Sequence, residues 1–265
     1  MNEIILWIIW FFISVFILDV FYYRWLPAII RNPVLEIHTN IKTLEYVKIP
    51  SWVRDLRIIG KGLESLKGCP EGIQKLDLQN NKLKNLEYLP LSATHVRASS
   101  NQITTLLHLV NHKNIVSLGL SFNHLTNLIG FPPHCKNAVI YYNMIISPKG
   151  LPQDSKMDKL FLGNNLITSD TLHYIPVTTN LDLICNKLTN LEGLKEGIEI
   201  LHTDSNRIVT LKGIPSTLTI LRVSDNLLTN CIGTSELRHL KVINLLKMDQ
   251  CTTLGLPKTV EEIIQ

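Results

Sequence analysis

The sequence predicts a repeat solenoid of the α/β type. In this curved rod, short parallel strands line the concave face, and extended or 3₁₀ segments form the convex face. Three observations lead there. A frame of the form Leu-x-Leu-x-x-Asn-x-Leu recurs eight times after residue 50. Its Asn residues are separated by 20, 22, 20, 22, 21, 20 and 20 residues. Prolines mostly fall ten or eleven residues before the next Asn, between coils, where a missing N–H costs nothing.

Composition limits the class of protein before any motif is read. Of 265 residues, 45% are apolar and 18% are charged, so the chain can build a core and is not a disordered polar protein. A net charge of +4 is too small to indicate nucleic-acid binding. The five cysteines are scattered and odd in number, which is typical of reduced thiols rather than of a disulfide framework.

The N-terminal segment is apolar enough to be a membrane anchor. Residues 4–23 form a run of twenty, close to the length that an α-helix needs to span a bilayer. Asp19 falls near one end of the run, and Tyr22, Tyr23 and Trp25 suit the membrane interface. A cleaved signal peptide needs a basic start and a small-residue cleavage site, and a core helix needs a polar stripe. The run has none of these features, so we expect a single-pass transmembrane helix.

Charge around this run predicts its orientation. No Lys or Arg precedes it, whereas Arg24, Arg31, Lys42 and Lys48 follow it. The positive-inside rule therefore places the C-terminal repeat region in the cytoplasm.

The expected organisation is one anchor followed by one solenoid. Residues 1–30 are the anchor and juxtamembrane segment, and 56–233 hold the repeats. Residues 31–55 are an N-terminal cap or degenerate repeat, in which Trp52 can cover the open end of the rod. Residues 234–265 are either a helical cap or a degenerate C-terminal repeat.

The recurring Asn has a structural explanation. Two Leu residues spaced two apart point to one face of a strand, after which the backbone turns inside the rod. Buried backbone groups at this turn need partners, and an Asn amide offers both donors and an acceptor to its own coil and the next one. The predicted structural Asn ladder comprises Asn81, Asn101, Asn123, Asn143, Asn165, Asn186, Asn206 and Asn226.

This pattern resembles the leucine-rich-repeat family, in its short class with repeats of 20–22 residues. The resemblance covers nearly all of the chain after the anchor. It implies a parallel-strand solenoid, and it implies little about function because the family uses one scaffold for many partners.

No catalytic motif is found in the sequence. His134 and Cys135 are adjacent, and we expect both in a surface loop. Asp182, His202 and Asp204 fall at exposed strand positions of adjacent coils, close enough to share an ion, although such a set is more often a solvated polar patch. The sequence therefore predicts no enzyme, no cofactor and no metal site.

Outward-facing strand positions carry a cluster of aromatic residues in the middle of the predicted rod. Exposed aromatic residues surrounded by polar ones are typical of protein-binding hot spots. The alternatives are that these rings only stack on one another, or that a slip of the frame turns some of them inward. The predicted partner-binding residues are Phe122, Val139, Tyr141, Tyr142 and Phe161.

Together these features predict a membrane-tethered, non-enzymatic module that recruits a protein partner through its concave face, without nucleic acid or a small-molecule substrate. One alternative is an outward-facing adhesion or receptor-like ectodomain. Another is an enzyme with its active site on the concave face.

Overall fold

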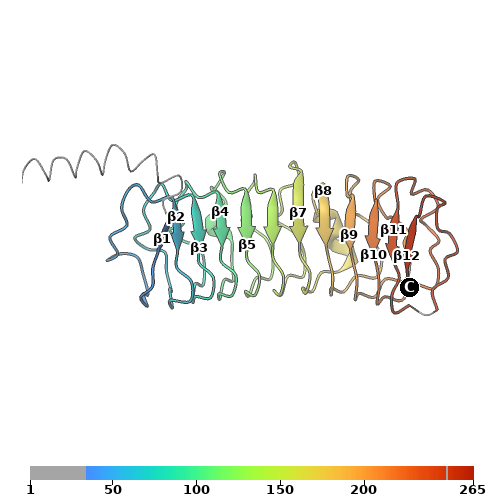
Figure 1. Ribbon diagram of the computed structural model, residues 1–265, viewed down its shortest axis with the longest axis horizontal. Helices are drawn as coiled ribbons and strands as arrows, with labels where there is room; N and C mark the ends of the chain where they lie inside the picture. Colours follow the sequence, from blue (N-terminus) through green and yellow to red (C-terminus); the bar gives the residue numbers. More distant parts are fainter. Residues whose placement is uncertain (1–33, 249) are drawn as a thin grey trace, which may run out of the picture.

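A computed structural model describes residues 34–248 and 250–265 of the chain. These residues form a rod in which twelve short strands make one parallel sheet, in strict sequence order (Figure 1). The strands are β1 (Val34–Glu36), β2 (Asp55–Arg57), β3 (Lys75–Asp77), β4 (His95–Arg97), β5 (Ser117–Gly119), β6 (Asn137–Val139), β7 (Met157–Phe161), β8 (Thr178–Asp182), β9 (Ile200–His202), β10 (Ile220–Arg222), β11 (Val242–Asn244) and β12 (Glu262–Ile264).

In the three-residue strands β2–β6 and β9–β11, the middle side chain points into the rod and its two neighbours point outward. Leu118 of β5 pairs with Ala138 of β6, which pairs with Leu160 of β7, and all three side chains are buried. The residues on either side of them face the opposite way, as the two-residue period of a strand requires. A single hydrophobic core therefore runs through the described coils, from Ile37 to Cys251.

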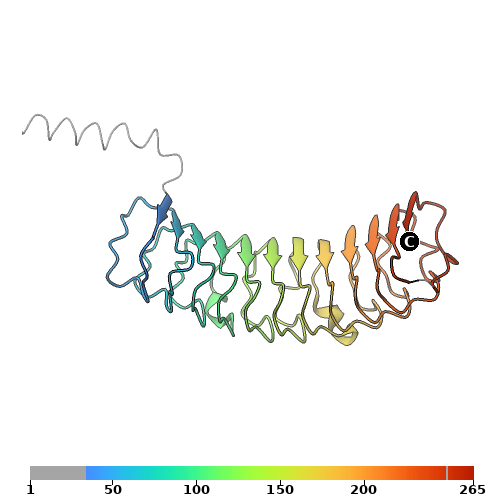
Figure 2. The ribbon, with the colours of Figure 1, turned by 60° about the horizontal axis from the view of Figure 1, so that its bottom comes forward.

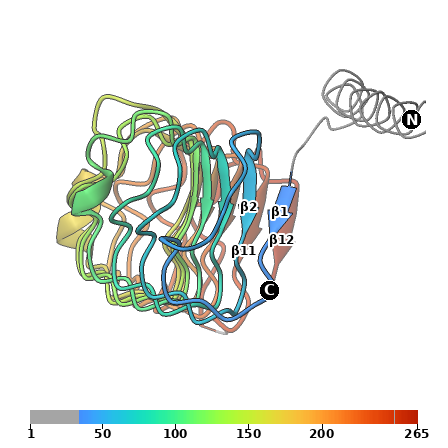
Figure 3. The same cartoon turned by 90° about the vertical axis from the view of Figure 1, so that its left-hand side faces the viewer.

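The rod is curved, and the sheet lines its inner side (Figure 2). Viewed from one end, the strands form one wall and the returning segments close the opposite wall (Figure 3). Two 3₁₀ helices lie on that outer wall, η1 (Leu107–Leu109) and η2 (Ser169–Tyr174). The α/β description was wrong for this part of the chain, because the described residues contain no α-helix. About ten residues per coil are too few for one.

The Asn side chains bond successive coils together. Asn165 Oδ1 accepts a hydrogen bond from the N–H of Ile145 (3.1 Å). Its Nδ2 donates to the carbonyls of Ile140 and Leu162, both at 3.0 Å. Since Ile145 and Ile140 belong to the previous coil, the expectation that the amide reaches the next coil was wrong: it reaches back.

All eight Asn residues repeat this arrangement. Each accepts from an N–H of the previous coil and donates to a carbonyl of that coil. Seven of the side chains are buried, and Asn226 is half-buried. The ladder thus runs through the rod from the third strand to the tenth.

Both ends of the rod continue the coil pattern without the ladder bonds: Asn40 holds the ladder position of the β1 coil, but it is exposed and makes no side-chain hydrogen bond within the described residues. β1 lies within residues 31–55, and β11 and β12 lie within residues 234–265, where the chain forms further coils rather than a helix. Lys61 and Met248 stand where the ladder would place Asn. Trp52, expected to cover the end of the rod, is 53% exposed.

The expected membrane anchor, residues 4–23, lies outside the described residues. Within residues 34–248 and 250–265, the structure contains no helix whose length and apolar character would let it cross a bilayer.

Candidate functional site: the central concave face

The residue just before each ladder Asn adopts a left-handed backbone conformation. At this point the chain leaves the sheet and turns into the loop, and φ lies between +52° and +67° from Gly60 to Asp225. Gly, Asn and Asp tolerate this conformation best. The residues before the eight ladder Asn are Asn80, Ser100, Phe122, Tyr142, Asn164, Cys185, Ser205 and Asp225, and Gly60 holds the same position before Lys61.

Two aromatic residues at this position form a stacked pair, here called the rim pair, Phe122 and Tyr142. Their φ angles are +57° and +53°, which costs a bulky side chain roughly 1 kcal/mol each. The ring centroids are 4.5 Å apart and the planes differ by 9°. The side chains nevertheless remain 54% and 51% exposed. Because the same conformation recurs in the other coils, it belongs to the fold, and what distinguishes these two coils is that bulky, exposed rings occupy it.

A second pair, here called the concave pair, consists of Tyr141 and Phe161 on the sheet face. Their ring centroids are 6.0 Å apart, with planes inclined by 35°. Tyr141 donates a hydrogen bond from its hydroxyl to Asp182 Oδ2 (2.7 Å), which lies two coils further on. Burial, reinforced by the bond to Asp182, raises the pKa of Tyr141 above its ordinary value. Tyr141 therefore remains a neutral donor.

Gly163 makes this bond possible. It occupies the coil between Tyr141 and Asp182, and the Tyr141 ring passes over it. A Cβ added at Gly163 would lie 2.7 Å from Tyr141 Cε1 and 3.0 Å from Asp182 Oδ1. The absence of a side chain thus lets Tyr141 lie across the sheet, fixed at both ends.

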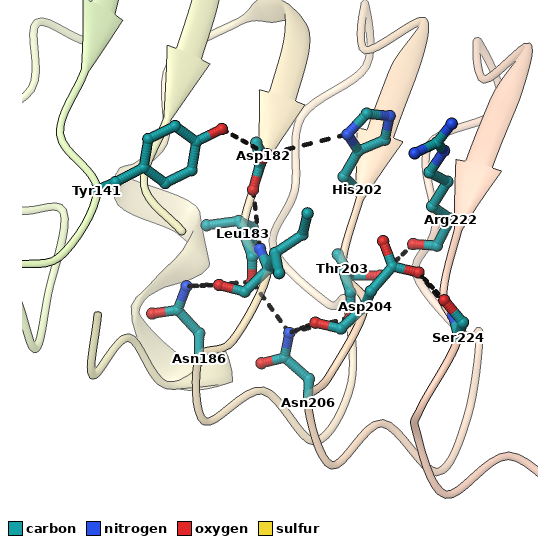
Figure 4. A network of polar contacts seen from close by, with 11 residues as sticks. Tyr141, Asp182, Leu183, Asn186, His202, Thr203, Asp204, Asn206, Arg222 and Ser224 are labelled. Atoms are coloured by element: carbon teal, nitrogen blue, oxygen red, sulfur yellow. Dashed lines mark hydrogen bonds and ion pairs between the residues drawn. The ribbon is translucent and has the colours of Figure 1, made fainter. Parts of the chain in front are cut away.

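Asp182 is the centre of a polar network (Figure 4). Only 5% exposed, it also accepts from the Ile184 N–H (3.0 Å), and its Oδ2 lies 3.9 Å from His202 Nδ1. Asp204 instead accepts from the backbone N–H and the hydroxyl of Ser224. The prediction that Asp182 is exposed was therefore wrong, and Asp204 bonds the coil beyond rather than joining Asp182.

Asp182, His202 and Asp204 therefore do not converge on one point, as sharing an ion would require. Among the described residues, no group of three or more His, Cys, Asp or Glu side chains is placed to hold a metal ion.

The five predicted partner-binding residues occupy neighbouring coils but two surfaces. Val139, 37% exposed, and the half-buried concave pair lie on the sheet face. The rim pair lies one residue beyond the sheet face, at the turn. We call the five residues together the aromatic patch. The slip of frame considered above does not occur, since Ala138 is buried in register with Leu118 and Leu160.

The pair His134 and Cys135 separates in the structure. His134 is exposed, whereas Cys135 is fully buried in the core, so the surface-loop expectation was wrong for Cys135. Burial raises the pKa of the Cys135 thiol to about 12. Such a thiol is not a poised nucleophile.

Sequence reasoning missed the roles of Gly163 and Asp182 in fixing Tyr141. A detectable signal existed: Gly163 follows β7 at the position that Tyr141 holds after β6, and Asp182 lies in the next coil, in register with Phe161. A glycine there indicates close approach of another group.

The curved rod with an internal Asn ladder defines a class of protein. Its fold is that of leucine-rich-repeat proteins, with about twelve turns of about twenty residues. A scan of protein-family models gives no match, and none of the curated proteins matches the sequence.

Solved structures with this fold include YopM from Yersinia enterocolitica, with 21% identity and a TM-score of 0.54. That alignment covers 86% of this chain and 63% of the YopM chain, so this chain spans less than two thirds of its length. The leucine-rich-repeat part of FLRT2, solved in an octameric complex with Latrophilin 3 and Unc5D, has 19% identity and a TM-score of 0.67, covering 80% of this chain and 74% of that one. An internalin from Listeria monocytogenes has 16% identity and a TM-score of 0.63, covering 85% and 70%.

Proposed function

We propose that this protein is a non-enzymatic leucine-rich-repeat module that binds a protein partner through the aromatic patch. The observation that carries this proposal is the rim pair: two exposed, stacked rings held in a backbone conformation that suits small polar residues. Other coils place Ser100 and Asn164 at the same position. Because the fold does not require aromatic side chains there, a binding role accounts for them best.

Rigidity of the concave pair supports the same role. Tyr141 is fixed by Asp182 at one end and by its own strand at the other. A side chain that is already immobilised loses little entropy when a partner covers it, which favours affinity. Among the proteins with a similar fold, FLRT2 was solved in a complex with Latrophilin 3 and Unc5D, and LRIM1 was solved in a complex with APL1C.

Membrane tethering is the second part of the proposal. Residues 4–23 are the anchor, and the repeat region lies in the cytoplasm. A tether raises the effective concentration of a captured partner near the membrane. The cysteines among the described residues are all free, which suits a reducing compartment. A reporter fused to the C-terminus tests this topology. If the reporter is found on the outer side of the membrane, the adhesion or receptor-like alternative is favoured instead.

Catalysis on the concave face finds less support than binding. One grouping of titratable side chains on this face is Tyr141, Asp182 and His202. Tyr141 is kept protonated by its burial and by Asp182, so its hydroxyl is not prepared to act as a nucleophile.

Cross-linking followed by affinity purification of the tagged full-length chain tests partner binding. Two variants remove the patch: Tyr141→Ala/Phe161→Ala (the concave variant) and Phe122→Asn/Tyr142→Asn (the rim variant). Tyr88→Ala is the matched control, since Tyr88 is also exposed and has positive φ. We expect a protein retained by wild type and by the control but lost from both patch variants. Equal retention by all four proteins would reject the patch.

A further inference from the structure

The concave face is asymmetric on the two sides of the aromatic patch. On the C-terminal side, the carboxylates are already bonded within the protein: Asp182 by Tyr141, and Asp204 by Ser224. On the N-terminal side, over β1–β5, lies a depression of about 380 Å³ whose charged lining holds three carboxylates and three cations: Glu36, Asp55, Asp77, Arg57, Lys75 and Arg97. The charges there are less completely paired.

Two cationic side chains in this depression are open to a ligand. Within the described residues, Lys75 of β3 makes no ion pair and no side-chain hydrogen bond. Arg97 of β4 lies 3.8 Å from Asp77 Oδ2 through Nη1, beyond hydrogen-bonding distance, and its side chain is 73% exposed. Asp77 already accepts from Gln79 Nε2 at 2.9 Å. Lys75 and the exposed part of Arg97 can thus bind an anion, and both lie nearer to the aromatic patch than Glu36 and Asp55, which belong to β1 and β2.

The depression joins the aromatic patch through a gap. Gly119 of β5 stands between Arg97 of β4 and Val139 of β6 in the paired register. With no side chain at Gly119, an apolar group can rest against the sheet beside Val139 while a carboxylate reaches Arg97.

We propose that the partner presents an acidic residue and, about three residues away, a large apolar residue on an extended segment along the rod axis. The inference rests on the proposed binding function and adds the chemistry of the partner. Arg97 and Val139 are two coils apart, about 10 Å at the usual strand spacing. An extended chain rises about 3.3 Å per residue, so the carboxylate and the anchor are about three residues apart. The carboxylate binds Lys75 and Arg97, and the apolar side chain packs on Val139 and the concave pair.

Electrostatic complementarity of this kind sets specificity and orientation more than affinity. The apolar anchor provides the buried contact, and the carboxylate selects the register along the rod. Binding is therefore predicted to weaken as salt rises, since the cations are exposed and the Debye length is about 8 Å at physiological ionic strength.

A random 12-residue peptide display library, selected on the full-length chain in detergent, tests the inference. Selections run in parallel on wild type, on Lys75→Gln/Arg97→Gln, on the concave and rim variants, and on Lys84→Gln as control. Lys84 is an exposed lysine that follows the Asn81 turn, outside the sheet. We expect wild type and Lys84→Gln to enrich peptides with Asp or Glu about three positions from an aromatic or large aliphatic residue. These peptides should lose at least tenfold in affinity on Lys75→Gln/Arg97→Gln.

The outcomes separate the two proposals. One outcome overturns this inference and leaves the proposed binding function intact. In that outcome the selected peptides need the aromatic patch, show no preference for Asp or Glu, and bind Lys75→Gln/Arg97→Gln as well as wild type. Enrichment that neither patch variant reduces contradicts the binding function itself. As a last check, a selected peptide with Asp replaced by Lys should bind Lys75→Glu better than wild type. If the Lys-containing peptide binds wild type better than Lys75→Glu, the proposed charge pairing is rejected.

Discussion

Two adjacent positions in each central coil follow opposite rules. Asn123 and Asn143 lie inside the rod, 4% and 8% exposed, whereas their immediate neighbours Phe122 and Tyr142 are more than half exposed. The inner position is Asn in eight successive coils, from Asn81 to Asn226, because buried backbone groups need an amide there. The outer position changes from coil to coil. The fold thus requires Asn at the inner position, whereas the outer position is free to vary and can serve binding. Substitutions at the inner position should therefore change stability, and substitutions at the outer position should change binding.

The largest effect is expected at the inner position. Asn165→Ala removes the partners of Ile145 N–H and of two carbonyls in adjacent coils. Unpaired buried groups cost about 1–3 kcal/mol each, so we predict a loss of about 4 kcal/mol in the free energy of unfolding. Urea unfolding monitored by circular dichroism measures it. Asn40→Ala is the control, because Asn40 is exposed and makes no side-chain hydrogen bond within the described residues; equal losses in both would show that the ladder bonds are unimportant.

A smaller loss is expected where one coil touches the backbone of another. A Cβ at Gly130, where φ is +92°, would lie 2.4 Å from the Leu106 carbonyl oxygen. Gly62 has a φ of +75° and open space around it. Gly130→Ala should therefore cost about 3 kcal/mol and Gly62→Ala about 1 kcal/mol, the latter from conformation alone. Thermal unfolding of the two variants compares them, and similar melting temperatures would exclude crowding as the cause.

Gly163→Ala tests the concave pair, which lies beside the outer position. The added methyl group meets the Tyr141 ring and should displace it from Asp182. Losing a hydrogen bond to a buried carboxylate costs about 2 kcal/mol. Peptides selected on wild type should lose affinity for this variant. Phenol signals of Tyr141 in an NMR spectrum report the displacement directly, and an unshifted ring would show that Gly163 is not needed for its position.

The smallest effect concerns pH. The pKa of Tyr141 is raised in the folded protein, so its contribution to stability is complete below its ordinary value near 10 and is lost as pH rises further. Tyr141→Phe should be less stable than wild type by about 1–2 kcal/mol at pH 7. The difference should shrink above pH 10, where ionisation favours the unfolded wild type. A constant difference from pH 7 to pH 11 would mean that the hydroxyl does not sense Asp182.

Much of the architecture is visible in the sequence because it repeats. The Asn spacing predicts the ladder, and the Leu spacing predicts the buried strand positions, since each coil meets the same demands. Side chains that act across coils are harder to predict. Tyr141 and Asp182 are 41 residues apart, and only coordinates show that the ring spans the coil between them.

The direction of the ladder bonds and the exposure of Trp52 were also beyond sequence reasoning. An amide can satisfy backbone groups on either side with equal chemistry, so only the twist and offset of successive coils decide which. Whether a residue at the end of the rod is buried depends on the shape of the terminal coil, and the repeat pattern does not specify that shape.

The measurement that bears most directly on the central claim is the free energy of unfolding of Phe122→Asn/Tyr142→Asn. Asn suits the left-handed conformation, so strain is relieved by roughly 1 kcal/mol per site, while a lost ring stack removes about 0.5–1.5 kcal/mol. The account predicts a variant as stable as wild type, or more stable. A loss of more than about 2 kcal/mol would contradict it, because the rings would then serve the fold rather than a partner.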